Sequence, residues 1–392
     1  MSISTRERFL GICRFERRGD LCLLTPTIND FWDQTLKDWV KQGAPEQILD
    51  SRFRAAYFQF DYMHYLRDGI NSSPHREFME ISGGVSYGFL TPPIVPTYEP
   101  RLIEENERTV TVITHAGKKA RVFKDTPDKM PMFLDYPVKD RNSWEDYKKR
   151  LDPDTSERWP SDWNTYVQKA NSKTEPAMLH IGGFFGFLRE WMGLERLLYM
   201  FHDDPNLVED MMEQVYYVET EIIKRVIKDI KVDCAMFWED MAFKTGSLIS
   251  PDMVRKFMMP RYKKVTDILH GSGVDVIFLD SDGNINELIP LWLECGINFH
   301  WPLECAAGMD AVALRKKYGR DIILAGNLDK RVLSKGKDAI REEVMSKVPF
   351  LLESGGYFPC ADHLVPPDAT LENYRYFINT LREVAGLEKL PE

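Results

Sequence analysis

The second half of this sequence alternates short hydrophobic runs with longer amphipathic segments, and no other feature constrains the fold as strongly. Six runs have the length and composition of buried strands, at residues 177–179, 232–237, 274–279, 297–301, 322–325 and 357–358. Helical patterns separate or follow them at 186–200, 205–229, 251–271, 284–294, 309–317, 337–354 and 370–386. Buried strands that alternate with helices indicate a parallel sheet built from βαβ units.

Two strands in the first half complete a set of eight. Residues 21–24 form a short apolar run that Thr25-Pro26 closes, and one further strand is expected within 50–90. Eight strands with intervening helices predict a (β/α)8 barrel, or TIM barrel. The 392 residues exceed the roughly 250 of a bare barrel, so we expect one elaborated domain over 1–392. A helix at 5–17 is the expected N-terminal elaboration.

The pattern of hydrophobicity changes at 94–137, and this change indicates an insertion. Residues 109–114 and 120–123 alternate in hydrophobicity around a turn-like Ala116-Gly117-Lys118, which predicts an antiparallel hairpin. We expect 125–137, with its three prolines, to extend the hairpin as loop. Such an insertion would cap one end of the barrel. Residues 139–170 are polar and helical in pattern.

Composition excludes several classes of protein. A formal net charge of −10 opposes binding to nucleic acid. No apolar run approaches the ~20 residues of a membrane helix, and the polar start contains no signal-peptide core, so we expect a cytoplasmic protein. The six cysteines form no CxxC pair, as expected of reduced thiols. Oligomeric state stays open, with a homodimer among the alternatives.

Polar residues follow the predicted strands at the point where each one ends. The carboxyl ends of all strands in a barrel meet at one face, so residues far apart in sequence converge there. These residues are His180, Glu239, Asp240, Asp280, Asp282, Glu304, Asn327, Asp329, Asp362 and His363. Their placement makes the protein a candidate enzyme.

The strongest local signal is Asp280-Ser-Asp282. Alternate residues at a strand end point the same way, so the two carboxylates could bind one ion. Asp282 could equally be the cap of a helix that starts near Gly283, because Asp is favoured at that position. Asp280 lies deeper, where burial of its charge requires a cation or a hydrogen-bond donor.

The remaining strand-end residues each allow a structural and a functional interpretation. Glu304 is either a further metal ligand or a rim residue paired with Arg or Lys. His363 is either a hydrogen-bonding residue or a ligand, with Asp362 beside it to orient the ring. Glu239-Asp240 is either a loop salt bridge with Lys244 or a source of protons, and His180 lies at a strand end as a third candidate for acid–base work.

Glycines 182 and 183 precede a predicted helix. They favour a tight turn, although their backbone amides could instead face an anion. No GxGxxG or GxxxxGK[ST] motif follows any strand, so the sequence gives no support to nucleotide binding.

Several motifs resemble the uroporphyrinogen decarboxylase superfamily from about residue 175 onward. They are Gly246-Ser-Leu-Ile-Ser-Pro-Asp-Met, Gly326-Asn-Leu-Asp-Lys and His363-Leu-Val-Pro-Pro. The resemblance implies a (β/α)8 barrel in a group that includes decarboxylases and corrinoid-dependent methyltransferases. The decarboxylases carry an arginine-rich motif just after the first strand, whereas residues 25–32 here contain no arginine. Porphyrinogen is therefore a poor candidate substrate.

The resemblance to the methyltransferase branch also implies a metal site. By position, Asp280 and Asp282 are similar to the His-x-Cys pair that binds zinc in that branch, Glu304 to its Glu, and His363 to its late Cys. We therefore expect a divalent metal, zinc first, held by oxygen and nitrogen instead of sulfur. Such a site suits polarisation of an oxygen in the substrate.

These expectations lead to three hypotheses about function. The first is a methyltransferase that moves methyl from a small methoxylated, aromatic donor to a corrinoid (cobalamin) on a partner protein, with Glu239, Asp240 and His180 in proton handling. The second is a decarboxylase of a nonporphyrin acid, with Asp280 or His363 as proton donor. The third is a noncatalytic protein that binds a corrinoid protein or a metabolite.

Overall fold

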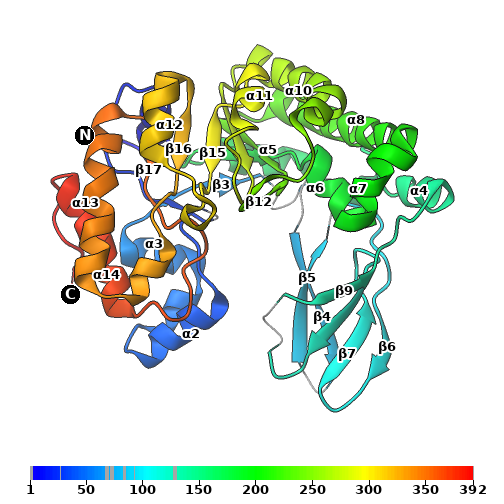
Figure 1. Ribbon diagram of the computed structural model, residues 1–392, viewed down its shortest axis with the longest axis horizontal. Coiled ribbons are helices and arrows are strands. Elements are labelled where there is room, and N and C mark those ends of the chain that lie inside the picture. The colour runs from blue at the N-terminus through cyan, green and yellow to red at the C-terminus, as the bar shows by residue number, and fades with distance from the viewer. Residues whose placement is uncertain are drawn as a thin grey trace.

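A curled sheet of parallel strands forms the centre of the molecule (Figure 1). The computed structural model describes residues 3–391 except 27, 67–69, 71–74, 83–84, 92 and 127–129. Seven strands pair in the order β17, β16, β15, β14, β11, β10, β3. Their bounds are Tyr357–Phe358, Ile323–Ala325, Phe299–Trp301, Val276–Asp280, Cys234–Trp238, Ala177–His180 and His64–Tyr65. All six strands predicted in the second half are thereby confirmed.

The first strands complete the arrangement. β1 (Leu24–Thr25) pairs in parallel with β2 (Asp61–Tyr62), and β3 begins two residues after β2 ends. A single parallel bridge between Phe31 and Val365 joins the segments that follow β1 and β17. The fold is therefore TIM-barrel-like, with its seam between the first and last strands.

Helices surround the sheet, and most occupy their predicted segments. They include α2 (Asp33–Lys41), α3 (Ser51–Phe58), α4 (Arg141–Lys148), α5 (Trp163–Asn171), α8 (Pro205–Asp229), α12 (Ala311–Tyr318), α13 (Lys337–Ser354) and α14 (Leu371–Val384). The segment 251–271 is helical but irregular: α9 (Pro251–Met253) passes through a π-helical turn, Val254–Met258, into α10 (Met259–Gly271).

Two of the later predicted helices differ from the structure, and the helix predicted at 5–17 ends at Cys13. Segment 186–200 is divided into α6 (Phe184–Met192) and α7 (Leu194–Asp203) at Gly193, whose φ is 82°. A side chain at Gly193 would lie 2.6 Å from the Tyr136 ring, so both the conformation and the space favour glycine. The helix expected at 284–294 begins only with α11 (Ile289–Glu294).

Helix α1 (Thr5–Cys13) closes the amino end of the barrel. Phe9 packs inside the ring of strands, with its ring 6.2 Å from that of Phe278 and 5.5 Å from that of Phe358. Arg6 pairs with Asp233, at the amino end of β11, at 2.9 Å. The predicted N-terminal elaboration is thus a plug beneath the lumen.

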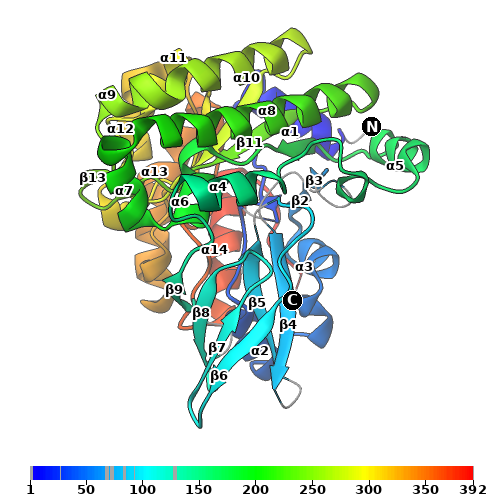
Figure 2. The same cartoon turned by 90° about the vertical axis from the view of Figure 1, so that its right-hand side faces the viewer.

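The insertion is a lobe of antiparallel strands that projects from the barrel (Figures 1 and 2). β4 (His75–Ser82) pairs with β5 (Val85–Thr91), and a four-stranded sheet follows, with β6 (Arg101–Glu105), β7 (Thr109–Ile113), β8 (Lys119–Phe123) and β9 (Met132–Asp135). The predicted hairpin corresponds to β7 and β8. The expectation of a loop over 125–137 is wrong at β9, and the pair β4–β5 was not predicted.

The lobe leaves the barrel at the carboxyl end of β3 and lies against α6. Lys118 is buried and pairs with Glu190 of that helix. Within the described part of the chain, no helix combines the length and the apolar character that a bilayer crossing requires.

Candidate active site

Strand register brings the predicted polar residues to one level. Trp238 of β11 pairs with Asp280 of β14, which in turn pairs with Trp301 of β15. Val276 and Phe278 belong to the hydrophobic cluster inside the barrel, so the two-residue period of the strand directs Asp280 to the same interior side. Asp280 therefore stands at the carboxyl-end mouth of the lumen.

Five side chains gather around this mouth in two overlapping groups. The ligand atoms of Asp240, Asp280 and Asp282 lie within 4.8 Å of one another, as do those of Asp282, Glu304 and His363. Asp282 belongs to both groups. The four residues predicted to bind metal are thus brought together with Asp240, but Asp280 shares no group with Glu304 or His363.

The turn after β14 presents Asp282 to its neighbours. The N-cap residue of α11 is Leu288, so the interpretation of Asp282 as a helix cap is wrong. Gly283 has φ 85°, and a side chain there would lie 2.5 Å from the carbonyl oxygen of Ala242. The glycine lets this turn pack closely on the segment after β11.

His363 faces Asp282 across the mouth. Its Nε2 lies 3.4 Å from Asp282 Oδ2, and this interaction raises the pKa of the imidazole. Nδ1 accepts a hydrogen bond from the backbone N–H of Leu364 at 2.8 Å, which places the proton of the neutral ring on Nε2. The expectation that Asp362 orients this ring is not met, because the Asp362 carboxylate accepts from the backbone N–H groups of Cys305 and Lys330.

Glu304 approaches the cluster from the segment after β15. Its Oε2 accepts a hydrogen bond from the backbone N–H of Gly283 at 2.9 Å. Burial raises the pKa of Glu304, and the neighbouring charge of Asp282 raises it further. Its carboxylate is thereby directed at Asp282.

Arg189 of α6 fixes Asp240 at the other side of the cluster. Its guanidinium donates to the Asp240 carbonyl at 2.7 Å and to Oδ2 at 2.9 Å. Asp240 thus pairs with Arg189, and not with Lys244 as the structural interpretation of Glu239-Asp240 had it. Burial and the charge of Asp282 raise the pKa of Asp240 above its usual range, and Arg189 opposes that rise. Burial, with the charges of Asp240 and Asp282, raises the pKa of Asp280 well above its usual range.

Glu239 is adjacent to Asp240, but its side chain points to the start of α6 and not to the cluster around Asp282. Its carboxylate is fully buried and accepts the backbone N–H groups of Phe184, Phe185 and Gly186 at 2.8, 2.7 and 2.9 Å. The hydroxyl of Tyr262 donates to it as well. The amides after Gly182-Gly183 do face an anion, and that anion is the protein's own Glu239. Burial raises its pKa to about 7.

His180 ends β10 on the interior side. It pairs with Met236, which pairs with Phe278, so its ring lies one inward-facing residue nearer the amino end than Asp280. The ring is buried, with its centroid 5.2 Å from that of Tyr65. His300 alternates outward instead and stacks on Trp292, 5.6 Å away.

Sequence reasoning missed Arg189 and the structural role of Asp362. Arg189 lies inside a helix, where an arginine that faces solvent would look the same. Asp362 was noted only as a neighbour of His363, and its partners lie 57 and 32 residues away. No local signal could have identified either contact.

Comparisons with known proteins agree with this architecture. The sequence model of the family described as uroporphyrinogen decarboxylase (URO-D) matches residues 123–384. A curated uroporphyrinogen decarboxylase from Carboxydothermus hydrogenoformans is 27% identical over 143 residues, which span 36% of this chain and 38% of that relative. A methyltransferase from Methanosarcina mazei superposes with a TM-score of 0.60 at 14% identity, over 98% of this chain and 99% of the other.

Proposed function

Because this chain belongs to the uroporphyrinogen decarboxylase family, we propose that it is a metal-dependent methyltransferase that acts at the cluster around Asp282. The observation that carries the proposal is the group of Asp282, Glu304 and His363, whose ligand atoms lie within 4.8 Å of one another. Carboxylate oxygen and imidazole nitrogen are both protein ligands of zinc and related divalent ions.

The donor set fits such an ion with one adjustment. His363 Nε2 faces the Asp282 carboxylate, as a ligand would, but it carries the ring proton because Nδ1 accepts the N–H of Leu364. Binding of an ion at Nε2 must displace that proton, which couples metal binding to proton release. Asp282 and Glu304 present oxygen atoms that need no such change.

The bound ion would supply a Lewis acid for an oxygen of the substrate. We propose a small methoxylated, aromatic methyl donor and, as acceptor, the Co(I) form of a corrinoid on a partner protein. The O–CH3 bond would break with its electron pair left on the oxygen, and the methyl group would pass to Co(I), which supplies the electron pair of the new bond and is thereby oxidised to Co(III). The solved methyltransferase that matches the whole length of this chain supports this class of reaction by fold alone.

The chain's own residues would handle the proton that the released oxygen requires. Asp240 is suited to this because its pKa is raised and Arg189 fixes its orientation. Glu239 already accepts three backbone N–H groups and a hydroxyl, so the proton role passes from it to Asp240. His180 lies one inward-facing residue nearer the amino end of the barrel than Asp280, so it would contact the methyl donor from the lumen side.

A decarboxylase of a nonporphyrin acid is the second candidate. It is favoured by the family's own description and by Asp280, whose raised pKa would let it deliver a proton to the carbon that loses carbon dioxide. In this reaction no corrinoid is consumed.

The two candidates are separated by product analysis of protein purified without chelator. Methylcobalamin formed from Co(I) cobalamin and a methoxylated benzoate supports the methyltransferase, whereas carbon dioxide released from a carboxylated substrate supports the alternative. About one equivalent of metal is expected per chain. Asp282→Asn should lose both metal and activity, while Glu294→Gln, an exposed residue at the end of α11, is the control. Full metal content and activity in Asp282→Asn would refute the proposal.

A further inference from the structure

One buried carboxylate ties together the segments that follow the last three strands. Asp362 is 2% exposed. Its Oδ2 accepts from the backbone N–H of Cys305 at 2.7 Å, and its Oδ1 accepts from that of Lys330 at 2.9 Å. Its own N–H donates to the Leu328 carbonyl at 2.8 Å. The segments after β15, β16 and β17 therefore meet at this side chain.

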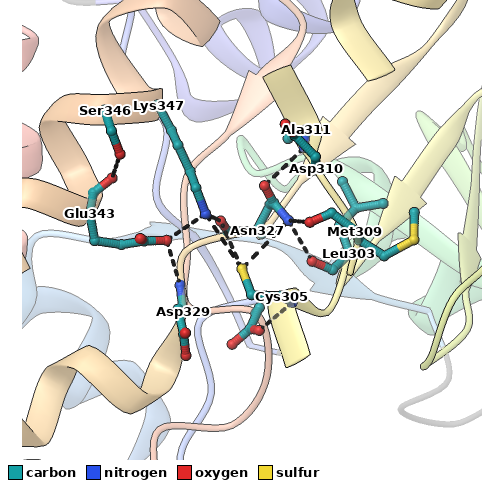
Figure 3. Close-up of polar contacts among 12 residues, drawn as sticks. Leu303, Cys305, Met309, Asp310, Ala311, Asn327, Asp329, Glu343, Ser346 and Lys347 are labelled. Carbon is teal, nitrogen blue, oxygen red and sulfur yellow. Dashed lines mark hydrogen bonds and ion pairs between the residues drawn. The ribbon is translucent and has the colours of Figure 1, made fainter. Parts of the chain in front are cut away.

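A second set of contacts holds the segment after β15 from its other side (Figure 3). The side-chain amide of Asn327 donates to the backbone carbonyls of Leu303 and Met309, each at 2.8 Å. The backbone carbonyl of Asn327 accepts from the Lys347 ammonium group at 2.7 Å. The Cys305 thiol donates to the same Asn327 carbonyl at 3.3 Å. These contacts join the segment to β16 and α13, but none of them reaches the segment that carries His363.

The contact between Cys305 and Asp362 has a special position in the chain. Glu304 immediately precedes Cys305, and His363 immediately follows Asp362. Each end of this 2.7 Å hydrogen bond is therefore one residue away from a member of the proposed metal site. The Asp362 carboxylate itself is engaged by backbone N–H groups and is absent from both groups of ligand atoms.

We propose that Asp362 is a positioning residue that sets the separation of Glu304 from His363 through its bond to the Cys305 N–H. The inference rests on the proposed metal site. Glu304 and His363 come from different strands, so their separation depends on contacts between the two segments. The hydrogen bond is charge-assisted and partly buried, and a charge-assisted bond is stronger than a neutral one. Loss of it should loosen the site while its ligands stay present.

Substitution at Cys305 tests the bond without any change to Asp362. Cys305 opens the 3-10 helix Cys305–Ala307, and Glu304 before it has φ −56° and ψ 117°, a conformation that a following proline allows. Cys305→Pro therefore removes the N–H donor at a position whose backbone suits proline. Cys305→Ala removes the thiol and keeps the N–H, so it is the matched control.

Affinity for metal and geometry at the metal are the readouts. Full-length protein would be titrated with Zn²⁺ against a chromophoric chelator, and the visible spectrum of the Co²⁺-loaded protein would report the ligand arrangement. We expect Cys305→Pro and Asp362→Asn to weaken Zn²⁺ binding by about 10–100-fold and to change the Co²⁺ spectrum, as loss of supporting hydrogen bonds does elsewhere. Cys305→Ala should keep both the affinity and the spectrum of the parent.

Lys347→Met separates positioning from stability. Lys347 holds the same segment through Asn327 and Cys305 but does not link it to His363. Its substitution should lower the melting temperature and leave the Co²⁺ spectrum unchanged. Cys305→Pro protein that folds, binds Zn²⁺ with parental affinity and has the parental Co²⁺ spectrum would overturn this inference but not the proposed function. Parent protein that binds neither ion would overturn the proposed function, and the inference with it.

Discussion

The backbone N–H of Phe185 donates to the carboxylate of Glu239 at 2.7 Å, in the first turn of α6. With the N–H groups of Phe184 and Gly186, it surrounds an acidic side chain that has no exposed surface. A carboxylate at this end of a helix is stabilised by the unpaired N–H groups and by the helix dipole. Glu239 therefore joins α6 to the end of β11.

We expect Glu239→Gln to destabilise the fold by about 1–3 kcal/mol, because an amide group cannot accept from all of these donors. The pKa of Glu239 is raised by burial from 4.5 to about 7, so the folded state holds its proton more tightly than the unfolded state. The stability that the folded state gains from holding this proton is complete below pH 4.5 and is lost as the pH rises to 7. Urea unfolding across this range should show a flatter pH dependence in the variant. An identical slope in both proteins would contradict the assignment.

Gly183→Ala should disturb the same junction from the backbone side. A side chain at Gly183 would lie 2.0 Å from the Trp238 carbonyl and 2.8 Å from the Glu239 carboxylate, so strand and helix would have to move apart. We expect a loss of about 1–3 kcal/mol in the free energy of unfolding. Gly271→Ala is the control, since no atom lies within 4 Å of the added carbon. Equal stability of the two variants would show that the close approach has no energetic importance.

Acid should destabilise the protein through His300. Both of its ring nitrogens are buried and have no hydrogen-bond partner among the described residues, and burial lowers its pKa from 6.5 to about 3. The folded state therefore takes up this proton later than the unfolded state, and stability present above pH 6.5 is lost as the pH falls toward 3. His300→Phe should keep the stacking on Trp292 and be more stable at pH 5 than the parent. Thermal melts at pH 5 and pH 8 would detect this, and a smaller gain at pH 5 than at pH 8 would refute it.

Removal of metal should lower the melting temperature if Asp282, Glu304 and His363 bind an ion. A ligand that binds only the folded state adds about 2.7 kcal/mol when its free concentration is 100 times its Kd. Chelator should therefore destabilise the parent, and Zn²⁺ should restore it. Asp282→Asn should respond to neither. Scanning calorimetry of the two proteins would decide the matter, and a chelator effect of equal size in both would place the ion elsewhere.

Much of the barrel follows from sequence because its signals are local. Apolar runs such as 274–279 cannot be left in water, and the polar residues after them mark the mouth. The placement of Asp280, Asp282, Glu304 and His363 at one face then follows from the parallel arrangement of the strands. Residues 132–135 have no comparable signal, because their strand is partly exposed and its pairing with β8 stabilises it.

Neighbouring carboxylates were harder to tell apart. Glu239 and Asp240 are consecutive, yet one lies under α6 and the other faces the mouth. Their directions differ because the backbone turns at Asp240, whose φ is 46°, a value that few residues other than glycine adopt. Such a turn is a product of tertiary contacts, with Arg189 and the Asp282 N–H on the same side chain.

The plug formed by α1 packs against the side chains that fill the amino end of the lumen, so a small molecule can approach Asp280 only from the carboxyl-end mouth. Any molecule that reaches Asp280 must leave by the way it came, past the loops that carry Asp282 and His363. A large molecule bound over that mouth would prevent the release of a smaller molecule that had bound first. Two reactants of unequal size would therefore have to arrive in a fixed order, the smaller before the larger, and depart in the reverse one.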